Sequence, residues 1–309
     1  MPETPQDPRQ NARRDGRSTG KTLADRSLLA GREYAGVDQI DGPLVFIRKT
    51  HPVGYRELVE VDDGTGRTRL GMVLDTSEDV VVVQIFEGTT GLTMPNTRVR
   101  FRGEPLTLEV TDGMLGRVFN GLGMPIDDGP PPVGRDEKDV NGLAVNPTSR
   151  QYPKDFIQTG ISVIDGMNTL IRGQKLPIFS GNGLPHNELA AQIARQATLL
   201  DEDVEFTTIF AAMGVKYDVA EYFTRSFEQS GTLARTTLFL SLANAPSIER
   251  LLTPRAALTL AEHLAFDCGH HVLVLMTDMT NYCEALREVG SARGDIPARK
   301  CYPGYLYTN

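Results

Sequence analysis

Hydrophobic residues follow two different patterns along this chain, and the change of pattern divides the sequence into two parts. Between residues 37 and 110, short runs of β-branched and other apolar residues are separated by glycine, aspartate and proline. The runs are LVFI, ELVEV, RLGMVLDTSEDVVVVQIF, RVRF and LTLEV. This spacing predicts the strands of a small all-β barrel or sandwich, and the sequence DGTG at 63–66 predicts a hairpin within it.

Beyond residue 175, strand-like runs alternate with helix-like segments. KLPIFS precedes a helix expected over 187–200, FTTIFAAM precedes one over 218–230, TTLFLSLA precedes one over 247–266, and HHVLVLMTD forms a last strand. Strands that alternate with helices are typical of a doubly wound parallel sheet. We therefore predict an α/β fold whose parallel-sheet domain follows a small N-terminal β-barrel.

Changes in composition set the expected boundaries. Residues 1–33 mix proline, glycine and charged residues with few apolar ones, so we expect a disordered tail. The barrel is expected at 34–112, a connecting segment rich in proline, glycine and charge at 113–150, and the α/β domain at 151–309. The sequence stops after YPGYLYTN without a closing helix, so we expect a further C-terminal portion.

The overall charge excludes some classes of partner. A net charge of -8 and a pI near 5.2 disfavour binding to nucleic acid or to an anionic membrane surface. A stretch of about 18 apolar residues, which would span a bilayer, is absent, and the N-terminus has no apolar signal-peptide core. Three cysteines without a C-x-x-C spacing favour the cytoplasm. His270 and His271 are expected in the core, and no metal ligand is assigned because no third ligand follows at metal-binding spacing.

Two segments resemble phosphate loops. GRSTGKT at 16–22 lies in the polar tail with no strand before it, so we interpret it as a chance string. The second segment follows the expected strand at 177–180 and opens a helix. It consists of Gly181, Asn182, Gly183, Leu184, Pro185, His186, Asn187 and Glu188. A strand that leads through glycines into a helix lets backbone N–H groups converge on phosphates. A plain turn between strand and helix that binds nothing is the equally weighted alternative.

The chemistry of the second loop differs from that of an active ATPase. Pro185 stands in place of the last glycine, His186 in place of the lysine, and Asn187 in place of the Mg²⁺-binding serine or threonine. A mostly neutral imidazole is a poor substitute for an ammonium group beside the β- and γ-phosphates. We therefore expect that binding of ATP or ADP survives while catalysis does not.

Two later strands end at further candidate residues. Asp278 follows the strand 271–276, where a carboxylate could hold Mg²⁺ through water, although a turn or helix cap is the more common role of such an aspartate. Val215 follows the strand 207–213, where an ATPase would carry the carboxylate that orients water. Lys216 comes next and is interpreted as solvated. We assign no catalytic residue.

The longest informative segments resemble the B subunit of V-type and archaeal-type rotary ATPases, which also occur in some bacteria. They are YAGVDQIDGPL (34–44), GRVFNGLGMPIDDGP (116–130), DFIQTGISVIDGMNTLIRGQKLPIFSGNGLPHNELAAQI (155–193) and MTDMTNYCEALREV (276–289). The resemblance covers nearly all of residues 34–309, and SGNGLPHNE is its most specific part. Catalytic subunits of these rings and flagellar-export ATPases keep the lysine and the water-orienting glutamate.

The resemblance implies a RecA-like, P-loop-type domain in a ring where this subunit alternates with catalytic A subunits. The ring couples ATP to ion transport through a central stalk and a membrane sector, so the chain is expected to be cytoplasmic and peripheral to the membrane. In the family, an arginine from a segment after the YPGY motif reaches the neighbouring catalytic site, and that segment lies beyond this sequence. Two alternatives remain: a structural ring spacer without nucleotide, and an independent RecA-like ATPase. The coupled ion and the direction of work are not encoded here.

Overall fold

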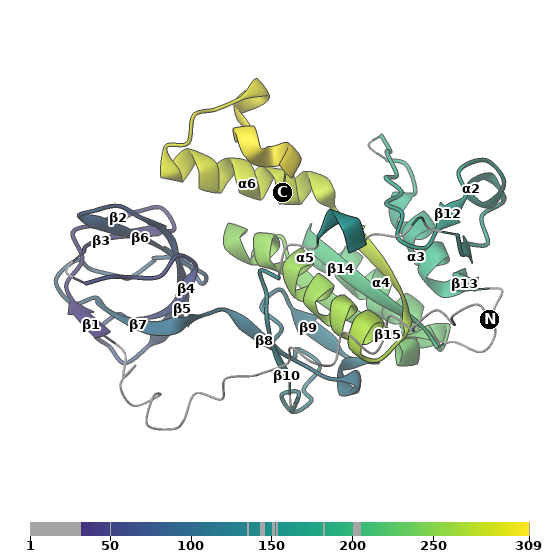
Figure 1. Cartoon of the computed structure of the whole chain (residues 1–309), viewed down its shortest axis with the longest axis horizontal. Helices are drawn as coiled ribbons and strands as arrows, with labels where there is room; N and C mark the ends of the chain where they lie inside the picture. Colours follow the sequence, from purple (N-terminus) through teal and green to yellow (C-terminus); the bar gives the residue numbers. More distant parts are fainter. Residues whose placement is uncertain are drawn as a thin grey trace, which may run out of the picture.

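The computed structural model describes residues 32–49, 51–134, 136–142, 146–149, 152, 154–181, 183–199 and 205–308. The expected tail up to residue 31, the segment 16–22 and Asn182 lie outside these ranges. An antiparallel barrel lies at one end of the molecule, and an α/β domain carries the rest of the chain (Figure 1). None of the helices in the described ranges combines the length and apolar composition that crossing a bilayer requires.

The N-terminal sheet forms because alternate residues of its strands are apolar. It has the order β1-β7-β4-β5-β6-β3-β2, with every pair antiparallel. The strands are β1 (Arg32–Ala35), β2 (Gln39–Asp41), β3 (Leu44–Arg48), β4 (Glu57–Asp62), β5 (Thr68–Thr76), β6 (Val80–Ile85) and β7 (Arg98–Pro105). Their valines, including Val45, Val59 and Val83, pack into one buried core. The hairpin predicted at 63–66 is confirmed between β4 and β5, where Gly64 and Gly66 adopt φ of +80° and +91°.

The LTLEV run lies outside the barrel sheet. It forms β8 (Thr107–Val110), which pairs with β10 (Asp136–Asp139). Leu108 and Val110 pack against Ile209 and Phe239 of the α/β domain, because that domain offers them a buried apolar surface. The segment expected to be a connection also contributes β9 (Val118–Asn120), which adds to the parallel sheet beside β15. The structure thus places most of the described part of this segment with the second domain.

The parallel sheet confirms the predicted α/β fold. It has the order β16-β14-β15-β9, formed by β14 (Phe206–Val215), β15 (Thr236–Leu242), β16 (His271–Thr277) and β9. Its helices α4 (Tyr217–Gln229) and α5 (Ser247–Glu262) lie close to the predicted ranges, and α6 (Met279–Arg293) follows the last predicted strand. Helix α5 has buried residues all round its surface because it packs against the sheet, β8 and α6. The short helical turns are η2 (Asp112–Met114), η3 (Pro147–Ser149), η4 (Thr232–Arg235), η5 (His263–Asp267), η6 (Arg299–Cys301) and η7 (Gly304–Thr308).

A small subdomain lies between β10 and β14 in the chain and packs on β16. It contains β11 (Phe156–Gln158), α2 (Ser162–Met167), β12 (Leu170–Ile171), α3 (His186–Gln196) and β13 (Thr198–Leu199), with the order β12-β11-β13 in its sheet. Ile193 of α3 packs against Leu273 of β16 in a shared buried cluster. This contact holds α3 beside the strand that leads to Asp278.

The strand predicted at 175–180 is wrong. Residues 174–180 form no strand in the structure, and the side chain of Phe179 is 92% exposed. Pro177 has no N–H to donate to a sheet, and only three residues separate it from Gly181, so the run is too short and too poor in donors to pair. Residues 174–180 therefore form an exposed segment that belongs to no sheet.

An ion pair fixes the turn after β9. The Arg117 guanidinium donates to both carboxylate oxygens of Asp127, at 3.0 and 2.8 Å, and Asp127 also accepts from the backbone N–H of Val118 and Gly129. The Arg117 hydrogen bonds hold the pKa of Asp127 at about 2, below its ordinary value of 3.8. This stabilisation is present above about pH 4 and is lost as the pH falls through the lowered pKa.

Replacement of Asp127 by asparagine is expected to lower the free energy of unfolding by about 1 kcal/mol at pH 7, because one charge-assisted pair near the surface is lost. The difference from the unmodified chain should shrink as the pH is lowered from 5 toward 3. Urea unfolding at several pH values measures it. A difference that stays constant over this range would show that shape, and not charge, makes the contribution.

Candidate functional site

The carboxyl ends of the parallel strands meet at one edge of the sheet, where α/β proteins bind their ligands. Ala212 of β14 lies opposite Thr277 of β16, and Met213 lies opposite Ser241 of β15. This register brings Val215 and Asp278 to the same edge. Two of the expected positions are therefore together in space although more than sixty residues separate them.

Asn281 holds this edge together, although no pattern in the sequence selects it. Its Nδ2 donates to the carbonyl oxygens of Met213 and Gly214, at 3.1 and 3.0 Å. Gly214 has a φ of +63°, and a Cβ at this position would lie 3.0 Å from the Arg250 side chain and 3.1 Å from Asn281 Cβ. Glycine is therefore required where β14 bends toward α4. The only indication of this bend in the sequence was a glycine at the end of a predicted strand.

Asp278 caps α6. Its Oδ1 accepts from the backbone N–H of Thr280 at 2.9 Å, which is the role that aspartate commonly has at a helix start. The carboxylate lies at the sheet edge, as expected, but one oxygen is engaged in the cap. An Mg²⁺ ion held through water would have to share this carboxylate with the helix cap.

The N-terminus of α3 fits an anionic group. The helix begins at His186 after Pro185, without a side-chain cap. The N–H of Leu184 donates to Gly181 O at 3.3 Å and that of His186 to Leu184 O at 2.8 Å, so both N–H groups face inward. The N–H groups of Asn187 and Glu188, together with the helix dipole, are then the donors that this turn offers to a phosphate. Glu188 in this turn carries a negative charge that competes with such a ligand.

His186 takes part in a local contact. Its Nδ1 lies 3.1 Å from the hydroxyl of Ser180, so the ring is held at the base of the loop. Gly183 adopts a φ of +81°, a conformation that glycine accepts without strain. The imidazole lies at the start of α3, which is the position where we expect it to stand in place of the lysine. Asn182, between the two glycines, lies outside the described residues.

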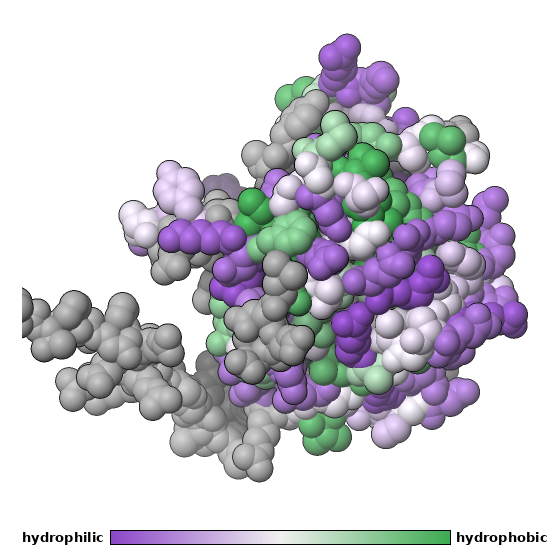
Figure 2. Space-filling view, turned by 90° about the vertical axis from the view of Figure 1, so that its right-hand side faces the viewer, coloured by the Kyte–Doolittle hydropathy of each residue, from purple (hydrophilic) through white to green (hydrophobic). Residues whose placement is uncertain are grey.

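The loop surface is open and partly apolar. Figure 2 shows the face that includes α2 and α3, where hydrophobic residues form small groups among mostly hydrophilic ones. Ile178, Phe179 and Leu184 of the loop region are 46%, 92% and 57% exposed. Apolar side chains in this position are available for contact with another surface.

Val215 and Lys216 match their sequence-based interpretations. The Val215 side chain is buried at the end of β14, and its carbonyl accepts from Ala243 N at 2.8 Å. A buried valine neither accepts a proton nor polarises water. Lys216 is exposed at the start of α4. Among the described residues, the register of the strands thus brings Asp278 and Val215 together at this edge, while His186 and the N-terminus of α3 are placed by their own contacts in the subdomain that packs on β16.

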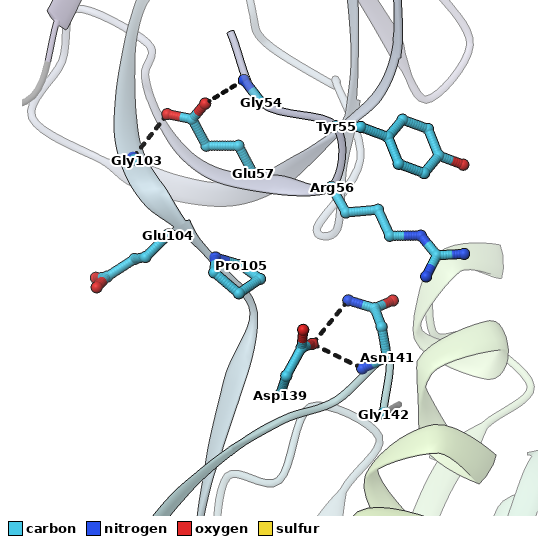
Figure 3. A pocket seen from close by; sticks show the side chains of 10 residues that line it. All are labelled: Gly54, Tyr55, Arg56, Glu57, Gly103, Glu104, Pro105, Asp139, Asn141 and Gly142. Carbon is cyan, nitrogen blue, oxygen red and sulfur yellow. Dashed lines mark hydrogen bonds between the residues drawn. The ribbon is translucent and has the colours of Figure 1, made fainter. Parts of the chain in front are cut away.

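A separate cavity lies between the barrel and β10 (Figure 3). Its volume is about 310 Å³. The Glu57 carboxylate accepts from Gly54 N at 2.8 Å and Gly103 N at 2.6 Å, and Asp139 accepts from the backbone and side chain of Asn141 at 2.8 and 3.0 Å. Two carboxylates that are already hydrogen-bonded disfavour a polyphosphate here. We interpret the cavity as the crease between the two domains.

An N-terminal antiparallel barrel followed by a parallel-sheet domain, with a glycine-containing turn into a helix, defines a nucleotide-binding protein of the α/β P-loop type. Two family models match the chain: the β-barrel domain of the ATP synthase alpha/beta family over residues 37–103, and the nucleotide-binding domain of the same family over residues 160–309. The chain belongs to the ATP synthase alpha/beta family. The matched nucleotide-binding domain contains the loop at 181–188, Val215 and Asp278.

Proposed function

We propose that this chain is the non-catalytic, nucleotide-binding B-type subunit of a V- or A-type rotary ATPase or ATP synthase. It alternates with catalytic A subunits in a hexameric ring, on the cytoplasmic side of the membrane. With the central stalk and the membrane sector, the ring couples ATP synthesis or hydrolysis to ion transport. One observation carries the proposal: His186 begins α3 where the phosphate-binding lysine would stand, and Val215 ends β14 where the water-orienting carboxylate would stand.

The nucleotide site comprises the loop at 181–188 and Asp278. The first-turn N–H groups of α3 hold the phosphates of ATP or ADP, and Gly181 and Gly183 allow close approach of the backbone. A bound Mg²⁺ would neutralise phosphate charge, with Asp278 as its protein partner through water. Without an ammonium group, the nucleotide has a weak or structural role.

The purified full chain is expected to bind ATP and to release no phosphate, at any magnesium concentration. Isothermal titration calorimetry measures the first result and a phosphate-release assay the second. The variant Asn187→Asp places a negative charge in the first turn of α3 and should weaken binding by about tenfold, because an anion at this position repels phosphate. Gln192→Glu, on the same helix beyond its first turn, is the matched control and should leave binding unchanged.

The alternatives give different results. A structural spacer would bind no nucleotide, and an independent ATPase would show turnover that is lost in Asp278→Asn. Mixed with catalytic subunits, the chain should form rings with equal numbers of both subunits, visible in native mass spectrometry. Turnover by the isolated chain, or rings of this chain alone, would contradict the proposal.

A further inference from the structure

Three side chains of metal-binding type meet at the end of α5, although they come from two distant parts of the sequence. Asp112 begins η2, His263 begins η5, and Cys268 follows η5. Cys268 Sγ donates to Asp112 Oδ1 at 3.1 Å and lies 3.7 Å from His263 Nε2. All three ligand atoms lie within 4.8 Å of one another. Because β16 begins at His271, directly after this cluster, the group lies at the opposite edge of the sheet from Asp278.

The spacing of these atoms suits a tetrahedral transition-metal ion. Zinc binds sulfur at about 2.3 Å and histidine nitrogen or carboxylate oxygen at about 2.0–2.2 Å, which separates neighbouring ligand atoms by roughly 3.5 Å. The observed separations of 3.1 and 3.7 Å fall on either side of this value. A small rotation of the Cys268 side chain therefore makes room for the ion. The mixture of sulfur, nitrogen and oxygen ligands favours zinc over magnesium or calcium.

His263 is oriented as a metal ligand. Its Nδ1 lies 2.9 Å from Asp267 Oδ2, so the proton on Nδ1 is held by that carboxylate and Nε2 presents its lone pair toward Cys268. The Asp267 carboxylate is in turn fixed by Lys138 Nζ at 2.9 Å. A carboxylate that orients a histidine from behind is the usual second layer of a zinc site. His263 itself is only 8% exposed.

The backbone holds the two parts of the cluster in a fixed relation. Val110 and Met114, on either side of Asp112, share a buried core with Leu260 and Leu264, which flank His263. A π-helical turn begins at His263, and its hydrogen bond from Cys268 N to His263 O at 3.1 Å brings the thiol back toward the imidazole. Such turns occur often at functional sites because they move one side chain out of the regular helical position.

We propose that Asp112, His263 and Cys268 form a binding site for one zinc ion. On binding, the Cys268 thiol releases its proton to water and the thiolate bonds to the metal. Cys268 and Asp112 lie at the surface, so a water molecule completes the fourth position. The ion links η2, which follows β8, to the connection between α5 and β16. This site does not depend on the function proposed above.

Metal binding by the full chain, without a histidine tag and after removal of metal with a chelator, tests the site. Titration with zinc against a chromophoric indicator should give one ion per chain. Cobalt should give the near-ultraviolet charge-transfer band of a thiolate ligand. Cys268→Ser and His263→Gln should each weaken zinc binding at least tenfold, and Cys268→Ser should abolish the cobalt band.

Two further variants distinguish zinc binding at this cluster from zinc binding by any other thiol of the chain. Asp267→Asn leaves all three ligands in place and should weaken zinc binding by about tenfold while the cobalt band remains. Cys283→Ser removes a thiol on α6 and should change neither measurement. Absence of the cobalt band in the unmodified chain, or zinc binding that is the same in Cys268→Ser, would overturn the proposal. The cobalt measurement needs no variant, so it decides the question even if a variant fails to fold.

Discussion

Replacement of His186 by lysine is expected to tighten ATP binding by about 10- to 100-fold. The side chain stands at the start of α3, where a lysine ammonium would form a charge-assisted hydrogen bond with phosphate, a contact of about 1.5–3 kcal/mol. Each 1.4 kcal/mol corresponds to about tenfold in affinity. Calorimetric titration of the variant and the unmodified chain with ATP measures the change. The gain should decrease with added salt, because the new contact is between charges.

Turnover should remain absent in this variant, since the buried Val215 still cannot orient water. Gln192→Lys adds the same charge to α3 farther from its N-terminus and serves as the matched control. Equal gains in both variants would show that the net charge of the chain, and not the position of His186, limits binding. No gain in His186→Lys would mean that phosphates do not approach the start of α3, and the proposed nucleotide site would have to be abandoned.

Replacement of Phe223 by alanine should remove about 3–5 kcal/mol from the free energy of unfolding. Phe223 lies on α4 and is fully buried against β14. The centroid of its ring lies 4.3 Å from the ring centroid of Phe210 and 6.2 Å from that of Phe227. Removal of the ring leaves a cavity among aromatic and aliphatic neighbours that are held by the sheet and cannot collapse into it. Domains have a total stability of about 5–15 kcal/mol, so this change consumes a large part of it.

Urea unfolding followed by circular dichroism measures this loss. The control is Phe179→Ala, because that side chain is 92% exposed in the loop before α3. We expect its effect to stay within about 0.5 kcal/mol. A large loss for Phe179 together with a small one for Phe223 would contradict the described packing, since it would mean that the loop is buried and the face of α4 is not.

The regular elements of the α/β domain were predictable because their patterns are local. FTTIFAAM, TTLFLSLA and HHVLVLMTD are mainly apolar runs, and each became a strand of the parallel sheet. The helices between them repeat apolar residues at helical spacing, as in α4. The loop 181–188 and Asp278 could be selected as candidates from the sequence, since each adjoins such an element.

Some assignments failed because they depended on partners elsewhere in the fold. KLPIFS has an apolar strand-like composition, but Pro177 and its short length leave it outside the sheet. LTLEV has the same pattern as the barrel strands, and only the surface offered by Ile209 and Phe239 draws it away from them. A pattern of apolar residues predicts that a strand is buried, but it does not indicate which surface buries it.

The sequence by itself determined the α/β class, the hairpin at 63–66 and the alternation of strands and helices over 206–277, because each of these depends on neighbouring residues. It also carries the prediction that histidine replaces the lysine at residue 186. Only the tertiary structure decided that Asn281 holds the end of β14, that Asp278 caps α6, and that Asp112 meets His263 and Cys268. More than 140 residues separate Asp112 from His263 along the chain. Contacts over such separations arise from the packing of a common core, which no local pattern records.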